Sequence, residues 1–204
     1  MGQAPAISSL LDTFIPYADV RRRHEIEIHA PAALVLETAR MFDVRSVPLV
    51  RAFFWLRAKV LGAKAHGTVW SQGFVQEMLR IGWGTLAEQR NRWFVAGAVC
   101  QPWLADVVFT PISPARFAAY SEPDQVKILW TLEAEHLDPA RSLFATETRA
   151  LGTDAQARAR FHSYWRRFGG GVVMIRWLFL AAIRRTAERQ WRAIQAGQKP
   201  SGAA

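Results

Sequence analysis

Hydrophobic and polar residues alternate over residues 21–29 in a pattern that predicts a half-buried strand. His24, Ile26 and Ile28 fall on one side of this segment, and charged residues separate them. Because side chains of a strand alternate between two faces, the apolar side is expected to meet a core.

Apolar residues then recur at helical spacing in two successive segments, residues 31–42 and 48–61. Pro31 suits the first turn of a helix, where the N–H that proline lacks would have no partner in any case. Gly62 is suited to end the second segment. The sequence therefore predicts two short helices directly after the first strand.

Strand patterns dominate from residue 83 onward. Residues 83–90 and 93–101 are separated by two polar residues, which favours a hairpin. Residues 126–136 alternate again, with Trp130 on the apolar side, and an Asp-Pro turn leads into a last strand over residues 141–151. Strands that follow one another through such turns predict an antiparallel sheet.

The last third of the chain predicts a long helical segment in two parts. A helix starting at Thr153-Asp154 places Phe161 and Trp165 on one side. Gly169-Gly170-Gly171 is expected to interrupt it, and a further helix runs from residue 172 to about residue 194. An apolar helix of this length has to cover one face of the sheet.

The order of these elements resembles the START-like or Bet v 1-like superfamily, also called SRPBCC, the polyketide cyclase and lipid-transport group. The motifs that carry the resemblance are Ala30-Pro31, residues 83–103 with Leu86, Glu88, Gly97 and Trp103, Thr146-Glu147-Thr148-Arg149, Thr153-Asp154, Tyr164-Trp165 and Ile175-Arg176. They match bacterial members and extend over residues 21 to about 190. The resemblance implies an α+β helix-grip fold, in which a curved antiparallel sheet wraps around the long C-terminal helical segment and encloses a cavity for a hydrophobic ligand. It transfers no catalytic residue.

The chain contains no linker and no internal repeat, and 50% of its 204 residues are hydrophobic. This is enough to bury one substantial core. We therefore expect a single domain over residues 1–204, with a leader at residues 1–20 and a disordered tail at residues 199–204.

Glu147 and Arg149 form the most specific polar pattern, because residues two apart on a strand share a face. Arg176, within an apolar helix, is their expected companion. Facing inward, such a group could orient a polar ligand head or polarise a carbonyl group. The alternative is a structural ion-pair network that holds the terminal helix to the sheet.

The nine tryptophans add aromatic side chains suited either to core packing or to a pocket for a flat or lipid-like ligand. Together with the polar group, they give the residues that we assign to a ligand site: Trp83, Trp93, Trp130, Glu147, Arg149, Phe161, Trp165 and Arg176.

Several site types lack the residues that they need. His24 and His29 fall on opposite faces of one strand, so we expect no metal site and no cofactor. The chain contains no Gly-x-Ser-x-Gly, Walker or Gly-x-Gly-x-x-Gly motif, and we assign no catalytic residue.

A single cysteine, Cys100, excludes an intrachain disulfide, which favours a cytoplasmic location. The longest apolar stretch, residues 169–183, is too short to span a membrane.

Charge is concentrated at the C-terminal end. From Arg158 onward the chain has ten basic residues and one acidic residue, whereas residues 1–157 are balanced. This is either a solvated helix face or a surface for weak contact with an anionic membrane. Without a recognised reading motif, we expect no nucleic-acid binding. Oligomeric state is not encoded in these patterns.

These observations leave three hypotheses for function. The first is binding or transport of a hydrophobic small molecule, such as a lipid or a polyketide-like compound. The second is an enzyme of the cyclase, dehydratase or isomerase type, with Glu147 as acid or base and Arg149 or Arg176 as electrostatic stabiliser. The third is a membrane-surface module that uses the basic C-terminal helix.

Overall fold

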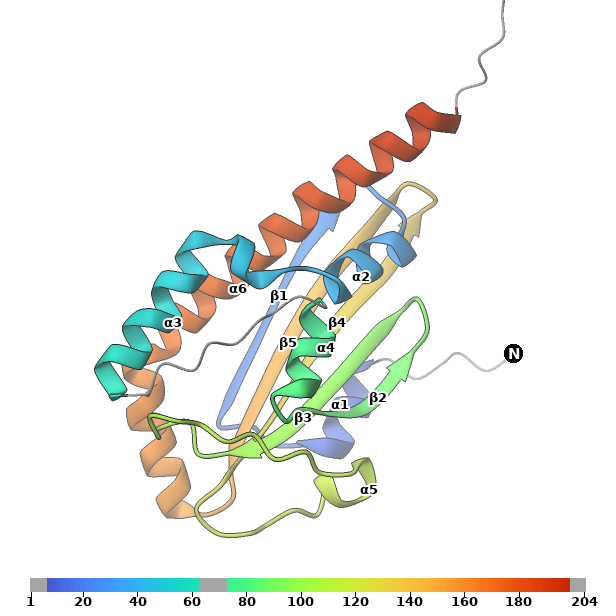
Figure 1. Ribbon diagram of the computed structural model, residues 1–204. Helices are drawn as coiled ribbons and strands as arrows, with labels where there is room; N and C mark the ends of the chain where they lie inside the picture. Colours follow the sequence, from blue (N-terminus) through green and yellow to red (C-terminus); the bar gives the residue numbers. More distant parts are fainter. Residues whose placement is uncertain (1–6, 63–72, 199–204) are drawn as a thin grey trace, which may run out of the picture.

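The computed structural model describes residues 7–62 and 73–198, and in this part of the chain a five-stranded antiparallel sheet packs against a 44-residue helix (Figure 1). The strands lie in the order β1-β5-β4-β3-β2. Their bounds are β1 Val20–Ile28, β2 Gly84–Gln89, β3 Trp93–Cys100, β4 Val126–Asp138 and β5 Arg141–Gly152. The helices are α1 Ile7–Phe14, α2 Ala32–Arg40, the 3-10 turn Val44–Ser46, α3 Pro48–Leu61, α4 Phe74–Arg80, α5 Pro114–Phe117 and α6 Ala155–Gln198.

Strand alternation divides this sheet into two faces, which we name by the helix that each one meets. The inner face packs against α6, and the outer face packs against α1. In β5, Phe144 contributes to the inner core, whereas Arg149 contacts α1 on the outer side. A shift of one residue along a strand therefore moves a side chain from one face to the other.

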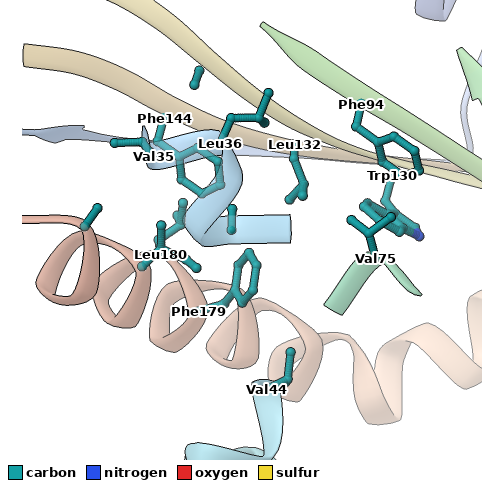
Figure 2. Packing of buried hydrophobic residues seen from close by; sticks show 14 of the residues in the cluster. Val35, Leu36, Val44, Val75, Phe94, Trp130, Leu132, Phe144, Phe179 and Leu180 are labelled. Atoms are coloured by element: carbon teal, nitrogen blue, oxygen red, sulfur yellow. The ribbon is translucent and has the colours of Figure 1, made fainter. Parts of the chain in front are cut away.

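The inner face carries the larger apolar core (Figure 2). Buried residues from β3, β4 and β5 meet side chains of α2, α4 and α6, including Leu132 from the sheet and Leu180 from α6. The antiparallel sheet, the long C-terminal helix and the helices that follow β1 confirm the expected α+β helix-grip fold. The arrangement of sheet and helices implied by the START-like resemblance is thus the one observed.

The outer face has its own core, centred on α1. Ile7, Leu11 and Phe14 point onto the sheet from this helix, and Phe14 meets Phe117 of α5 edge to face, with ring centroids 6.0 Å apart. Residues 7–14 lie within the leader expected at residues 1–20, and apolar residues at helical spacing form a buried helix there for which no element was predicted. Residues 1–6 of that leader and the tail expected at residues 199–204 lie outside the described residues.

The expected break at Gly169-Gly170-Gly171 is also wrong, because α6 continues through the three glycines. A Cβ atom at Gly171 would lie 2.0 Å from the ring of Phe53 on α3, and one at Gly169 would lie 2.7 Å from the ring of Trp165. Two of the glycines thus make room for aromatic rings. Packing of the helix against its neighbours outweighs the low helix propensity of glycine.

Candidate functional site

An aromatic cluster on the inner face is the first candidate site. Trp130, in the middle of β4, lies with its ring centroid 5.0 Å from that of Phe74 on α4 and 5.6 Å from that of Phe94 on β3. Trp83, directly before β2, lies 6.1 Å from Trp130. Phe179 of α6 closes the cluster at 5.1 Å from Phe74. The sheet, a short helix and the long helix therefore all contribute rings to one place.

Two indole nitrogens in this cluster lack hydrogen-bond partners. Trp83 and Trp130 are each only 7% exposed, and neither Nε1 atom meets an acceptor among the residues that the structure describes. Buried indole N–H groups usually find a partner, because leaving one unpaired costs roughly 1–3 kcal/mol. A pair of such donors close together is the kind of group that receives an acceptor atom of a ligand.

Phe161 and Trp165 do not join this cluster. Both lie near the N-terminal end of α6, with ring centroids 6.0 Å apart, in a separate core with Val20 and Ala150. The aromatic part of the ligand site assigned from sequence is thus divided along the inner face. Trp93 is removed from it altogether, because its cross-strand partner Glu133 belongs to the outer face.

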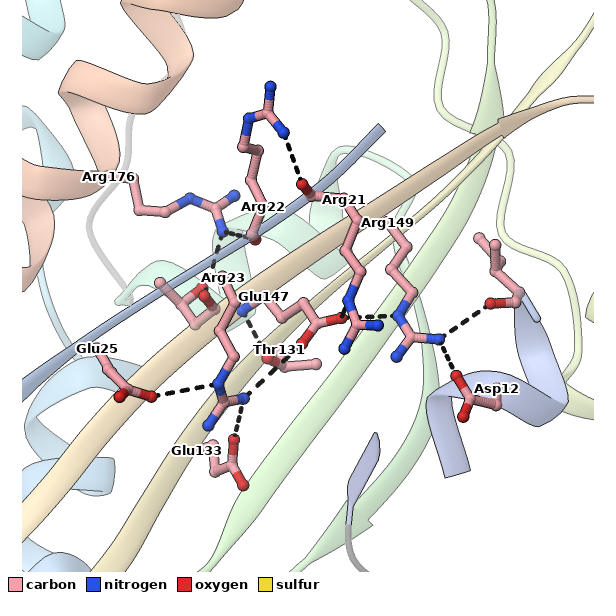
Figure 3. Close-up of polar contacts among 12 residues, drawn as sticks. Asp12, Arg21, Arg22, Arg23, Glu25, Thr131, Glu133, Glu147, Arg149 and Arg176 are labelled. Carbon is pink, nitrogen blue, oxygen red and sulfur yellow. Dashed lines mark hydrogen bonds and ion pairs between the residues drawn. The ribbon is translucent and has the colours of Figure 1, made fainter. Parts of the chain in front are cut away.

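The outer face carries a network of buried charges (Figure 3). Glu147 accepts a hydrogen bond from Arg149 Nε at 2.7 Å and forms an ion pair with Arg21, whose Nε atom lies 2.8 Å from the same oxygen; the Glu147 side chain is 2% exposed. Arg23 Nη1 donates to Glu133 at 2.7 Å and lies 3.8 Å from the other Glu147 oxygen. Each carboxylate of this group already faces at least one guanidinium.

Arg149 links this network to α1. Its Nη1 donates to the Asp12 carboxylate and, at 3.0 Å, to the backbone carbonyl of Ile15. Asp12 lies on α1 and Ile15 follows its end. The structural ion-pair network that was the alternative for Glu147 and Arg149 is therefore present. Its ion pairs hold the N-terminal helix to the sheet, however, and not the C-terminal one.

The expectation that Arg176 accompanies Glu147 and Arg149 is wrong, because the three side chains do not lie on the same face of the sheet. From α6, Arg176 donates to the backbone carbonyl of Arg22 at 2.9 Å and to the hydroxyl of Thr148, which lies between the two outer-face residues along β5. The sheet separates Arg176 from the Glu147 network, because neighbouring residues of a strand point to opposite faces. Burial lowers the pKa of Arg176 to about 10, against an opposing effect of Glu147, so it stays charged at neutral pH.

A groove of about 340 Å³ lies beside the charged network. Its lining includes Arg21, Arg23, Trp93, Glu133 and Glu147. A second hollow, of about 560 Å³, lies by the C-terminal part of α6 and is lined by residues such as His29, Arg141, Glu188 and Trp191. Neither lining includes Trp83 or Trp130.

Sequence reasoning missed the partners that complete the charged network, namely Asp12, Arg21, Arg23 and Glu133. The alternation of residues 21–29 contained a signal, since Arg21 and Arg23 share a face with Glu25. Recognising it required the register of β1 against β5, in which Arg23 is paired with Glu147.

Neither a metal-binding group nor a membrane-spanning helix is found among residues 7–62 and 73–198. No group of three or more His, Cys, Asp or Glu residues there could hold a metal ion. Within the same ranges, no helix is long and apolar enough to cross a membrane.

Comparisons with known proteins add little to this geometry. No protein-family model matches the chain, and no curated protein matches it. Among solved structures it is similar to the Zhui aromatase/cyclase from a Streptomyces species, with 15% sequence identity, a TM-score of 0.31, and coverage of 84% of this chain and 94% of that chain. A likeness of this size carries no argument about function, so the candidate sites rest on their own residues.

Proposed function

We propose that this protein binds a hydrophobic small molecule that carries a hydrogen-bond acceptor, and that it does so on the inner face beside Trp83 and Trp130. The observation that carries this proposal is the pair of indole N–H groups without acceptors inside an aromatic cluster. An apolar ligand body would contact the rings, and its acceptor would pair with a buried donor.

The energetics favour a neutral ligand with a polar atom over a plain hydrocarbon. An acceptor that meets a buried unpaired N–H removes a desolvation penalty of roughly 1–3 kcal/mol, which a hydrocarbon leaves in place. The surrounding rings are packed, so a ligand has to shift one of them. Phe74 belongs to α4, a helix of seven residues, and is therefore carried by a short element rather than by the sheet.

The enzymatic alternative receives less support from this geometry. Glu147, the residue considered as acid or base, lies on the opposite face of the sheet and is already paired with Arg21 and Arg149. The basic C-terminal surface is likewise partly occupied, because Arg184 pairs with Glu188 at 3.0 Å and Arg192 donates to the Glu188 carbonyl at 3.3 Å. Membrane contact through that segment stays a prediction.

Two probes of similar shape test the proposal. Acetylnaphthalene has a carbonyl acceptor, whereas ethylnaphthalene has none, and binding of each is followed by quenching of tryptophan fluorescence. The acetyl probe is expected to bind the unchanged protein about tenfold more tightly, because one additional buried hydrogen bond contributes on the order of 1.4 kcal/mol. Trp130→Phe and Trp83→Phe keep a ring but remove the donor, so each should shrink this difference.

Trp93→Phe is the matched control, because Trp93 lies on the outer face and lines the groove there. It should leave the preference for the acetyl probe unchanged. If Trp93→Phe weakened binding while Trp130→Phe did not, the ligand site would be the outer groove. Equal affinity for the two probes in the unchanged protein would remove the role of the indole donors.

A further inference from the structure

The helix α3 exposes an unusual amount of apolar surface. Leu49, Trp55, Leu56 and Val60 are 54%, 63%, 52% and 59% exposed, although all four belong to one helix of 14 residues. Leu49, Leu56 and Val60 recur at spacings of seven and four residues, so they fall on one side of the helix, and Trp55 lies next to Leu56. Soluble proteins rarely expose large apolar residues side by side unless that surface meets a partner.

The neighbouring side of α3 holds the helix to the rest of the molecule. Val50 is 2% exposed and belongs to the inner core. Phe53, four residues after Leu49, lies at the border between the two sides, and its ring packs directly against Gly171 of α6. Figure 1 shows α3 running along the outside of α6. The exposed apolar side can therefore meet a partner without any change in the contacts that attach the helix.

The charges of α3 indicate the kind of partner. All of its charged residues are basic, namely Arg51, Arg57 and Lys59, and it contains no acidic residue. Lys59 lies with its Nζ atom 5.2 Å from the centre of the Trp55 ring, so a cation and an indole ring sit together at the edge of the apolar side. Apolar residues bordered by tryptophan and basic residues are typical of helices that lie in the interface of an anionic membrane.

From this arrangement we infer that the protein docks on anionic lipid surfaces through α3, with the apolar side chains in the interfacial region and the basic residues at the headgroups. This inference does not depend on a ligand on the inner face. It also assigns membrane contact to a different surface from the arginines at the C-terminal end of α6.

The apolar contribution is tested by sedimentation of the full chain with vesicles at low salt. Phosphatidylcholine vesicles that contain about a third phosphatidylglycerol should bind the protein, and pure phosphatidylcholine should bind it weakly. Replacing Trp55→Ser together with Val60→Ser should lower binding by about tenfold or more, because the buried apolar area is lost. The matched control replaces the exposed residues Val108→Ser and Leu137→Ser elsewhere and should bind as before.

The basic contribution is tested with a second matched pair. Arg51→Gln with Lys59→Gln should weaken binding and reduce its dependence on salt, because fewer counter-charges meet the lipid headgroups. Arg189→Gln with Arg192→Gln removes two charges from α6 and should leave binding unchanged. If the second pair carried the binding instead, the surface would be the C-terminal part of α6 and the inference would be overturned.

Quenching of tryptophan fluorescence by brominated lipid tests the position of Trp55 with a substitution that keeps an aromatic ring. The quenching of tryptophan fluorescence on vesicle binding should be smaller in Trp55→Phe than in the unchanged protein. Absence of binding to anionic vesicles at low salt would overturn the inference. A concentration-dependent dimer that Trp55→Ser abolishes, without vesicle binding, would instead identify α3 as a contact between two copies of this chain.

Discussion

The two faces of the sheet bury very different chemistry. The inner face brings together aromatic rings and leaves two donor atoms, the Nε1 atoms of Trp83 and Trp130, without partners among the described residues. The outer face buries Glu147 and Arg149, both at most 2% exposed, and pairs each of them with more than one group. The inner face leaves neutral indole N–H groups unpaired, whereas on the outer face the charges are paired and, among the described residues, the Nη2 atom of Arg149 still lacks an acceptor.

This difference shows that burial and charge do not by themselves identify a binding site. Buried ions are tolerated only when they are paired, because the desolvation of an isolated charge costs several kcal/mol. The Glu147 network meets that requirement within the protein and attaches α1 in doing so. A neutral N–H group costs less to leave unpaired, so a protein can keep one available for a ligand.

The outer-face network is tested most directly by Glu147→Gln. This change keeps the shape of the side chain but removes the negative charge that faces Arg149, which is 2% exposed. Because a buried guanidinium then lacks much of its counter-charge, the free energy of unfolding should fall by about 3 kcal/mol in urea titrations.

Glu25→Gln is the control, since the Glu25 side chain is 52% exposed and meets the same network through Arg23. It should change the free energy of unfolding by less than about 0.5 kcal/mol. An unchanged unfolding midpoint for Glu147→Gln, together with weaker probe binding, would contradict the structural assignment and make the outer groove the working site.

The covering of the inner face depends on α6 being continuous, and its three glycines allow a graded test. A Cβ atom at Gly170 meets nothing within 4 Å, so Gly170→Ala should stabilise the protein by about 1 kcal/mol through higher helix propensity. At Gly171 the same atom would lie 2.0 Å from the Phe53 ring. Gly171→Ala should therefore be about 2 kcal/mol less stable than Gly170→Ala. Equal thermal stability of the two variants would show that α3 does not pack on α6 as described.

The sequence was sufficient to predict most elements of the fold, because local patterns determine them. Alternation over residues 126–136 and the turn before residue 141 correspond to β4 and β5, and the helix over residues 48–61 matches α3. The glycine run misled the prediction, since helix propensity is local whereas the contacts of Phe53 and Trp165 with those glycines come from the folded molecule.

The candidate site was harder to predict for a related reason. That Glu147 and Arg149 share a face follows from their spacing, but which face they share depends on how β5 lies between α1 and α6. The apolar residues of α1 contained the missing information. Once α1 is recognised as a buried helix, a second covered face becomes necessary, and the charged pair can belong to it.

His24 gives the smallest expected effect, at the rim of the inner face. Its ring meets that of Trp177 edge to face at 5.0 Å, and burial, with Arg176 and Arg22 nearby, lowers its pKa below the usual value. The unfolded chain therefore binds a proton that the folded protein resists, so stability is complete above pH about 6.5 and falls as the pH decreases from there. His24→Gln should flatten this part of the profile of unfolding free energy against pH. A protein that becomes more stable on acidification through this range, in a manner abolished by His24→Gln, would mean that His24 gains a negative partner instead and that the rim of the inner face is not positively charged.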